Sequence, residues 1–210
     1  EIPQRLIITI DGPAGCGKTS VALRLAKHLG VDLLDTGAMY RAAALIALEE
    51  GIDQGDGRGI VEGVRRADPH FVWSDDPPTL KIGDRNVMER IRDADVTGVG
   101  SPIAGLPALR EFLVARQREL AAERGRIVCE GRDQGSVVFP SADAKIYLDA
   151  SVEVRADRRA QQLRADKKSV DIEKLRALIA ARDESDRQRP VGPLVVPAGA
   201  FVLDTSELTR

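Results

Sequence analysis

The sequence predicts an α/β domain in which helices flank a parallel β-sheet. Residues 6–10 are apolar and mostly β-branched, and a Gly/Pro-rich segment follows them at once, which is typical of a buried parallel strand. Apolar residues then recur at every fourth position from 21 to 29, which indicates a helix. An apolar run at 31–34 and an Ala/Leu-rich stretch at 38–50 repeat this order. Strands that alternate with helices favour a parallel sheet covered on both faces.

The segment 52–104 interrupts this alternation, and the chain after it resumes it. The segment has few helical periods and several glycines and prolines around short candidate strands at 70–73 and 79–82, so we expect a small inserted subdomain at 61–104. The later predicted elements are helix 107–123, strands 127–130 and 145–148, basic helices 152–164 and 171–189, and strand 200–203. Pro190 disfavours helix at the residue before it and ends the second basic helix. We expect one domain, residues 1–210.

Composition excludes several classes of protein. Hydrophobic residues make up 43% of the chain and charged residues 30%, which is the balance of a globular domain. The net charge of −2 gives no general attraction to nucleic acid or to an anionic membrane, and no uncharged apolar stretch approaches membrane-spanning length. Cys16 and Cys129 lie far apart and form no disulfide framework. We expect a cytoplasmic protein without nucleic-acid or membrane partners, and we expect it to act as a monomer.

Residues 12–19 match the phosphate-loop pattern GxxxxGK[ST] without a mismatch. The match directly follows a predicted strand and directly opens a predicted helix, so its backbone N–H groups converge at the positive end of the helix dipole. This context predicts a nucleoside triphosphate site in which Lys18 reaches the β- and γ-phosphates and Thr19 ligates Mg²⁺. The candidate ATP-binding residues are Gly12, Pro13, Ala14, Gly15, Cys16, Gly17, Lys18, Thr19 and Ser20.

An acidic partner for the Mg²⁺ ion and its waters is open between several positions. Asp149 ends a predicted strand, but Ser151 and Glu153 follow it as at a capped helix N-terminus, and we favour a capping role for this segment. Asp11 and Asp35 also end predicted strands, at the sheet edge where α/β proteins bind ligands. The sequence alone does not rank Asp11 against Asp35.

Two clusters of arginines lie in the basic helices. Arg182, Asp186 and Arg189 share one helical face and can converge on one anionic ligand, whereas Asp183 and Arg187 form an i, i+4 pair that we expect on the exposed side. Three further arginines, Arg155, Arg158 and Arg159, share a face of the preceding helix. We interpret 154–170 as a lid whose guanidinium groups close over the transferred phosphoryl group, with a solvated basic helix as the alternative.

The motifs along nearly the whole chain resemble those of the bacterial cytidylate kinases. In family order they are IDGPAGCGKT, LLDTGAMYR, PALREFL, CEGRDQGSVVFP, AKIYLDAS and RDESDRQRPVGPL. The resemblance implies a P-loop kinase fold, with a parallel β-sheet flanked by helices, a small inserted nucleotide-monophosphate-binding subdomain and a helical lid. It also implies that the protein transfers the γ-phosphoryl group of ATP, bound with Mg²⁺, to CMP or dCMP.

The resemblance also implies roles for single residues, carried over by matching position. The implied catalytic residues are Lys18, Arg132, Arg155 and Arg159, and Arg158 joins the ATP-binding set. The implied CMP-binding residues are Arg41 and Arg132 at the phosphate, with Asp35 and Tyr40 nearby, Ser101, Arg110, Asp133 and Arg189 at the base, and Arg182 and Asp186 at the pentose. Cytosine offers an amino donor at C4 that a carboxylate accepts, whereas uracil would meet Asp133 with a carbonyl oxygen.

The sequence departs from the family pattern at a few positions. Lys18-Thr19-Ser20 replaces the more frequent Lys-Gly-Thr, which moves the expected Mg²⁺ hydroxyl to Thr19 and leaves Ser20 as an alternative. Gln134 stands where an apolar residue is usual, and glycines at 98 and 100 precede Ser101, so we expect a looser base pocket. The chain also lacks an initial Met and a closing helix after its last predicted strand, which leads us to expect a trimmed chain.

Two other functions compete with this interpretation. The nearest is a P-loop kinase for another small metabolite, such as shikimate or a different nucleoside monophosphate. A more distant one is a GTP-binding switch or an ATP-dependent binding module, and the sequence lacks the NKxD motif that reads guanine in such switches.

Overall fold

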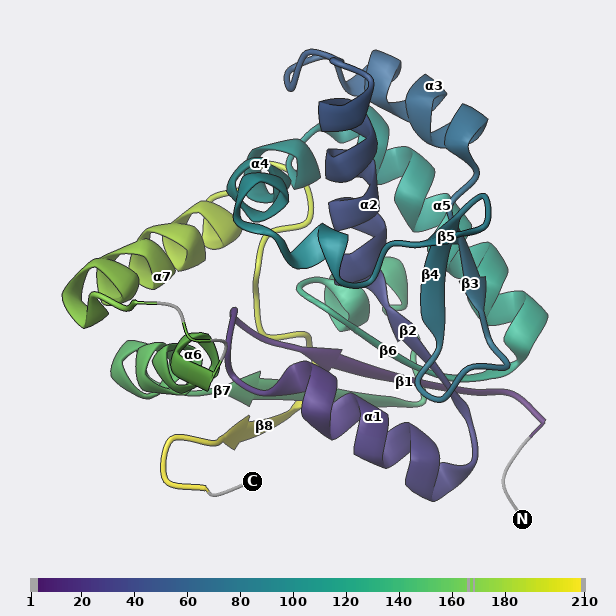
Figure 1. Ribbon diagram of the computed structural model, residues 1–210. Coiled ribbons are helices and arrows are strands. Elements are labelled where there is room, and N and C mark those ends of the chain that lie inside the picture. Colours follow the sequence, from purple (N-terminus) through teal and green to yellow (C-terminus); the bar gives the residue numbers. More distant parts are fainter. Residues whose placement is uncertain (1–3, 166, 168, 209–210) are drawn as a thin grey trace.

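A computed structural model of the protein describes residues 4–165, 167 and 169–208. A parallel β-sheet of five strands, in the order β2-β6-β1-β7-β8, forms its centre and confirms the predicted fold class (Figure 1). The strands are β1 (Leu6–Asp11), β2 (Asp32–Asp35), β6 (Arg126–Gly131), β7 (Ala144–Asp149) and β8 (Phe201–Asp204). Because all of them are parallel, their carboxyl ends meet at one edge of the sheet.

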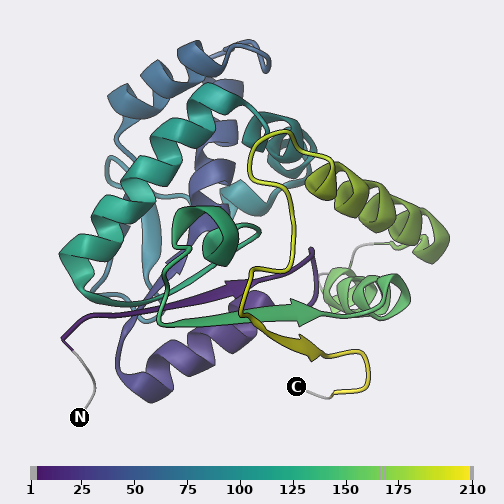
Figure 2. The same ribbon diagram turned by 180° about the vertical axis from the view of Figure 1, so that it is seen from behind.

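Helices cover both faces of the sheet. Helix α1 (Lys18–Leu29) lies on one face, and α2 (Thr36–Glu49) and α5 (Pro107–Arg124) lie on the other (Figures 1 and 2). Alternate residues of β1 follow this division, since Ile7 packs in the core on the α2 side and Ile8 packs in the core on the α1 side. A strand that is buried on both faces reads as a continuous apolar run, which is why the sequence predicted this one.

The segment between α2 and α5 adds no strand to the main sheet. It forms α3 (Gly57–Ala67), a small antiparallel sheet of β3 (His70–Val72), β4 (Thr79–Ile82) and β5 (Arg85–Asn86), a 3₁₀ turn η1 (Arg90–Arg92), and α4 (Ala94–Ala104). Strands β3 and β4 were predicted, whereas β5 was not. The boundaries of an insert at 61–104 remain a prediction.

Helices α3 and α4 were missed by the sequence analysis, which expected few helical periods in this segment. Each contains glycines, which lower helix propensity, and α4 also contains Pro102. In α3, packing explains one of them, because a Cβ on Gly63 would lie 2.8 Å from Cδ1 of Ile52 and 3.2 Å from Cγ2 of Ile46. Burial of α3 against α2 therefore outweighs a weak local preference for helix.

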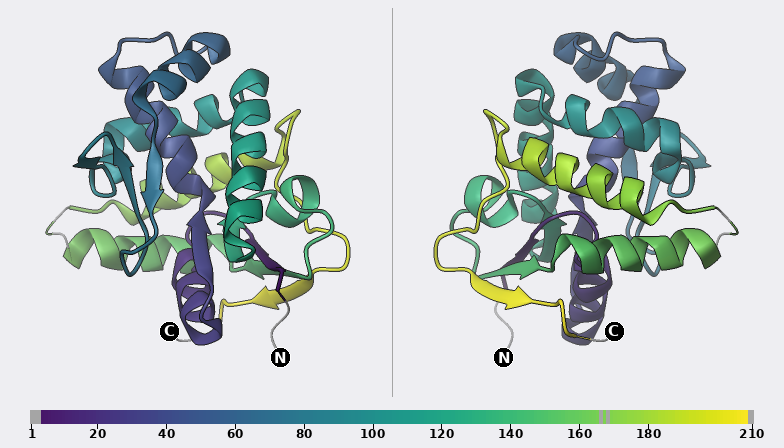
Figure 3. Two further views of the ribbon diagram at one scale, coloured as in Figure 1. Left: turned by 90° about the vertical axis from the view of Figure 1, so that its right-hand side faces the viewer. Right: turned by 90° about the vertical axis from the view of Figure 1, so that its left-hand side faces the viewer.

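Two helices, α6 (Val152–Ala165) and α7 (Ile172–Arg187), run side by side next to the carboxyl edge of the sheet (Figure 3). Both match predicted helices, with α7 ending at Arg187. The cap of α6 is Ser151, whose Oγ accepts from the Val154 N–H at 3.2 Å. The expected lid at 154–170 includes residues 166 and 168, which lie outside the described residues, and its closure remains a prediction.

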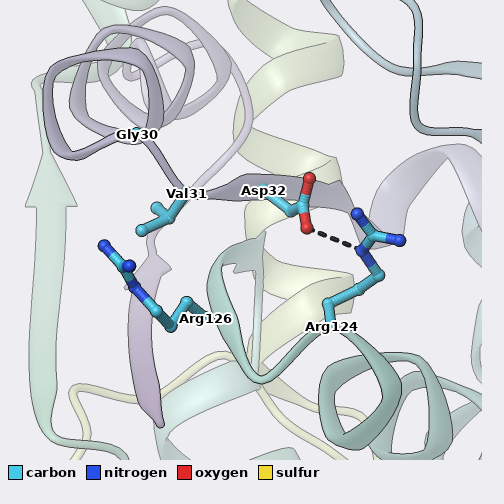
Figure 4. Close-up of a pocket in the computed structure, with 5 residues that line it drawn as sticks. All are labelled: Gly30, Val31, Asp32, Arg124 and Arg126. Atoms are coloured by element: carbon cyan, nitrogen blue, oxygen red, sulfur yellow. Dashed lines mark hydrogen bonds and ion pairs between the residues drawn. The ribbon is translucent and has the colours of Figure 1, made fainter. Parts of the chain in front are cut away.

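The opposite, amino edge of the sheet carries a hollow of about 420 Å³ lined by Gly30, Val31, Asp32, Arg124 and Arg126 (Figure 4). Arg124 Nε donates to Asp32 at 2.6 Å, and Arg126 Nη2 donates to the carbonyl of Leu29 at the end of α1. These arginines tie α5, β6, β2 and α1 together at the end of the sheet away from the phosphate loop. Among the described residues, no helix has the length and apolar character needed to cross a bilayer.

Candidate active site

The phosphate loop leaves β1 at the carboxyl edge of the sheet and turns directly into α1. Gly12 has φ +148°, and a Cβ there would lie 2.0 Å from the carbonyl oxygen of Leu148 in β7, so the neighbouring strand excludes any side chain. Gly17 has φ +102° and occupies the N-cap of α1 in a left-handed conformation. The two glycines therefore let the loop cross the end of β7 and begin the helix within six residues, from 12 to 17.

Three carbonyl groups of the phosphate loop accept hydrogen bonds from protein side chains. The carbonyl of Pro13 accepts from Lys18 Nζ at 2.7 Å, and that of Ala14 accepts from Arg155 Nη1 at 3.1 Å. The carbonyl of Cys16 has two donors, Arg158 Nη1 at 3.5 Å and Thr205 Oγ1 at 3.2 Å, and Thr205 shares its one proton with the carbonyl of Asp149 at 3.0 Å. Carbonyl oxygens repel phosphate oxygens, whereas N–H groups attract them. With these carbonyls bonded to side chains, the N–H groups are what the loop can offer to an anion.

Lys18 and Thr19 stand at the start of α1, as predicted for a phosphate loop. Lys18 is buried, and burial followed by the charge of Arg132 lowers the pKa of its ammonium group. Thr19 and Ser20 are exposed at the same helix N-terminus, where their hydroxyl groups can reach a ligand. The structure thus brings the predicted phosphate-binding lysine and both candidate hydroxyls to the same end of one helix.

The two acids that the sequence left unranked already bind protein groups. Asp11 is fully buried and accepts from the N–H groups of Gln134 and Gly135, both at 2.7 Å. Asp35 caps α2 through the Ala38 N–H at 2.8 Å and pairs with Arg41 at 3.0 Å. Their carboxylates hold the loop after β6 and the start of α2, which leaves them little capacity for metal-bound water.

Glu130 is a third acid, which the sequence analysis missed. It is the second-last residue of β6, in register with Asp35, and is 4% exposed. Its Oε1 atom has no hydrogen-bond partner among the described residues. Burial, reinforced by the charge of Asp35, raises the pKa of Glu130 to about 7, and the nearby Lys18 and Thr19 lower it. The signal that selected Asp11 and Asp35, an acid at the end of a buried strand, also applies to this residue.

Arg132 after β6, Arg182 of α7 and Arg189 just after α7 gather around Asp186, and Arg41 of α2 lies near Arg182. Arg132 Nε donates to Asp186 Oδ2 at 2.9 Å, and Arg189 pairs with the other carboxylate oxygen. Burial, followed by the charge of Arg132, lowers the pKa of Arg182 to about 10, and the charges of Arg41 and Arg189 also contribute. The Nε atoms of Arg41, Arg182 and Arg189 are buried without a partner in the described part of the chain. Such a group of desolvated cations is suited to a multiply charged anion.

Next to this cluster lies a second buried ion pair, between Arg110 and Asp133. Arg110 is 2% exposed, pairs with Asp133 Oδ2, and donates to the carbonyl of Ala104 at 3.2 Å. Its guanidinium group also lies 5.5 Å from the ring centre of Tyr40. Burial of Asp133 raises the pKa of this carboxyl group.

Ser101 belongs to the Asp186 cluster, because its Oγ lies 3.4 Å from both Asp186 Oδ1 and Arg189 Nη2. The structure therefore links the residues that the sequence placed around the base to those placed around the pentose and the phosphate.

One prediction about the basic helices is wrong in this structure. Asp183 does not lie on the exposed side of α7, since it is 1% exposed and pairs with Arg155 at 2.5 Å. The three arginines predicted to share a face of α6 differ in their exposure. Arg155 is buried, Arg158 donates to Thr205 Oγ1 at 2.9 Å, and Arg159 is exposed beside Gln162. Helix periodicity fixes which residues share a face, but the packing of α6 on α7 and on the phosphate loop decides which of them are buried.

Comparison with known proteins identifies relatives over almost the whole chain. A family model described as cytidylate kinase matches residues 8–210. Curated proteins named cytidylate kinase include one from Nocardia farcinica, 43% identical over 97% of this chain and 88% of its own length. One from Rhodococcus opacus is 45% identical over 97% of this chain and 89% of its own length. Among solved structures, TT1252 from Thermus thermophilus covers 95% of this chain and 88% of its own, with 20% identity and a TM-score of 0.45.

Asp11→Asn should remove a pH dependence of stability. Burial raises the pKa of Asp11 from 3.8 to about 6, so the folded state keeps a proton that the unfolded chain has released. The contribution of this group to stability is fully present below pH 3.8 and is lost as the pH rises through 6. Relative to the variant, the free energy of unfolding of the wild type should fall by about 2–3 kcal/mol from pH 4 to pH 7.

Urea unfolding of both proteins at several pH values measures this difference, and Asp53→Asn at an exposed turn is the control. Parallel curves for wild type and Asp11→Asn would show that Asp11 is ionised at the same pH in both states.

Proposed function

The chain belongs to the cytidylate kinase family, and from this we propose that it transfers the γ-phosphoryl group of ATP to CMP or dCMP. The products are ADP and CDP or dCDP. The observation that carries the proposal is the cluster of Arg41, Arg132, Arg182 and Arg189 next to the phosphate loop. Burial lowers the pKa of Arg182 and of Arg189, and repulsion by the neighbouring charge of Arg132 lowers both further. A phosphate monoester in that cluster would relieve the repulsion between the guanidinium groups. It would lie at the same carboxyl edge of the sheet as the triphosphate.

The donor end of the proposed site is the phosphate loop. Its N–H groups and Lys18 bind the triphosphate, at the N-terminus of α1. Mg²⁺, when bound with ATP, neutralises charge that develops between the β- and γ-phosphates. Thr19 fits as a direct ligand and Glu130 as the acid that orients the metal-bound waters. The unpaired Oε1 of Glu130 beside Thr19 supports this fit, because a buried carboxylate oxygen without a partner is costly.

The acceptor end is the pair of networks around Asp186 and Asp133. We assign the acceptor phosphate to Arg41 and Arg132, with Asp35 holding Arg41 in place, and the pentose to Arg182 and Asp186. We assign the base to Ser101, Arg110, Asp133 and Arg189, with Tyr40 packed against Arg110. The carboxylate of Asp133 accepts from the C4 amino group of cytosine. A uracil would place its C4 carbonyl there and leave both acceptors unsatisfied, which is a strong basis for rejection.

Phosphoryl transfer needs positioning and charge neutralisation more than proton transfer. An oxygen of the acceptor phosphate, already anionic near neutral pH, forms the new bond to the γ-phosphorus. The bond from that phosphorus to the bridging oxygen breaks, and ADP leaves with the electron pair. Lys18, Arg132 and Arg159 supply positive charge around the transferred group, with Arg158 at the ATP side. A catalytic role of Arg155 stays a prediction, since all three of its guanidinium nitrogens donate to protein acceptors.

Acceptor profiling tests the proposed function. With ATP and Mg²⁺ in excess, ADP release should depend on added CMP or dCMP, and kcat/KM for UMP should be lower by a factor on the order of 100, since uracil cannot pair with Asp133. Rapid turnover with AMP or shikimate, together with none with CMP and dCMP, would reject the proposal in favour of a kinase for another metabolite.

Asp133→Asn should weaken binding of CMP and leave binding of ATP nearly unchanged. Asparagine keeps the size of the side chain and can accept from Arg110, but it removes the carboxylate that accepts from cytosine. We expect KM for CMP to rise about 10- to 100-fold, which corresponds to about 1.4–2.8 kcal/mol, with KM for ATP within about twofold. Asp95→Asn, which removes an exposed pair with Arg90, is the matched control. Equal changes in both KM values would contradict the assignment of Asp133 to the base.

Glu130→Gln should raise the Mg²⁺ concentration needed for half-maximal rate. The amide cannot orient metal-bound water as a carboxylate does, so we expect an increase of about tenfold, with KM for CMP little changed. Titration of the rate with Mg²⁺ at fixed ATP gives the value, and Glu123→Gln at the exposed end of α5 is the control. An unchanged Mg²⁺ requirement in Glu130→Gln would assign the metal waters to another acid.

A further inference from the structure

Asp183 is a buried acid in α7 for which the proposed reaction has no role. It is 1% exposed, and its Oδ2 atom pairs with Arg155 Nη2 at 2.5 Å. The other carboxylate oxygen, Oδ1, has no partner among the described residues. Neither oxygen belongs to the sets proposed above for the base, the pentose, the phosphates or the metal.

Arg155 connects Asp183 to the donor side of the site. Its Nε donates to the carbonyl of Ala150 at the end of β7 at 2.8 Å, and its Nη1 donates to the carbonyl of Ala14 in the phosphate loop at 3.1 Å. The loop also packs on the same residue, since a Cβ on Gly15 would lie 3.5 Å from Cβ of Arg155. One side chain therefore joins the sheet, the phosphate loop and α7.

Helix α7 carries this connection on to the acceptor side. Asp186 lies three residues after Asp183, about 4.5 Å further along the helix axis. It holds Arg132 at 2.9 Å and pairs with Arg189, and both of these arginines belong to the proposed acceptor site. The hydrogen bonds from Arg155 to Ala14 and to Asp183 therefore connect the phosphate loop to the helix that positions the acceptor residues.

The stability of the folded protein alone does not explain the ion pair between Arg155 and Asp183. Removing both charges from water is costly, and the unpaired Oδ1 of Asp183 adds to that cost. Apolar side chains of similar size would hold α6 against α7 at least as well. The pair does supply directed bonds that fix α7 relative to one particular carbonyl of the phosphate loop, which apolar packing cannot do.

We propose that Asp183 is a positioning residue that, through Arg155, couples the donor loop to the acceptor face of α7, so that binding of either nucleotide raises the affinity for the other. The inference rests on the proposed function, because it names the two ligands from that function.

Calorimetry tests the coupling directly. The affinity for Mg²⁺ and AMP-PNP, an ATP analogue that is not hydrolysed, is measured with and without saturating CMP, and the affinity for CMP with and without the analogue. In the wild type, each ligand should lower the dissociation constant of the other by the same factor, on the order of fivefold or more. In Asp183→Asn, each ligand alone should bind within about twofold of the wild type, and the coupling factor should fall to near one.

Three further variants separate coupling from a merely structural role. Asp183→Glu, which keeps the charge, should recover part of the coupling. Arg155→Lys should lose it, because a single ammonium group cannot reach three acceptors at once, and this variant decides the matter if Asp183→Asn does not fold. Glu173→Gln breaks an exposed pair with Arg176 on the same helix and should keep full coupling.

The outcomes also separate this inference from the proposed function. A wild type that binds neither nucleotide refutes the proposed function and with it the coupling. A wild type that binds both without coupling refutes only the coupling. A folded Asp183→Asn or Arg155→Lys variant that keeps the coupling factor, with weaker binding of each ligand or a lower melting temperature, assigns the pair to stability.

Discussion

The hydrogen bonding of the phosphate-loop carbonyls is the constraint on which the rest of the site depends. A loop that binds several phosphate charges has to present its N–H groups, so its carbonyls need partners elsewhere. Here the partners come from three places in the chain, namely Lys18 of α1, Arg155 of α6 and Thr205 after β8. The parallel sheet makes this possible, because it brings the ends of β1, β7 and β8 to one edge. Parallel strands joined by helices are thus needed to build the loop as well as to bury the core.

A second consequence of that edge is a high density of buried charge. Arg132 and Arg189 share Asp186, Arg110 pairs with Asp133, and Arg155 pairs with Asp183. Each buried pair costs desolvation, so the pairs are poor sources of stability. They do hold planar guanidinium groups in fixed orientations before a ligand arrives. Burial, followed by the charge of Arg132, lowers the pKa of Arg182, so this cation is less stable here than in water. An arriving phosphate therefore meets groups that are already desolvated and oriented.

The sequence predicted the sheet and the phosphate loop because both depend on local patterns. Continuous apolar runs mark strands buried on two faces, and the spacing of glycines, Lys18 and Thr19 marks the loop. Helices α3 and α4 were missed because their glycines lower helix propensity. In α3, Gly63 is explained by its contacts with Ile46 and Ile52, which no local rule contains. In α4, a Cβ on Gly98 or Gly100 would meet no atom within 4 Å. The partners of Arg155 were also missed because no local rule contains them, since Asp183 lies 28 residues away and Ala14 lies 141 residues away. Glu130 was overlooked although its signal was the one applied to Asp11 and Asp35.

Lys18 shows how the site can be stable and still respond to its ligand. Its ammonium group donates to the carbonyl of Pro13 within its own loop, and burial lowers its pKa. A neutral carbonyl is a weaker partner for an ammonium group than a phosphate oxygen, because the phosphate oxygen adds the attraction between opposite charges. A triphosphate in the loop would therefore attract Lys18 away from Pro13 and restore the higher pKa. The carbonyl of Ala14 has no such competitor, since Arg155 is itself held by Asp183. Lys18 can thus change its partner at Pro13 by itself, whereas any movement of the loop at Ala14 involves Arg155 and, through it, Asp183 of α7.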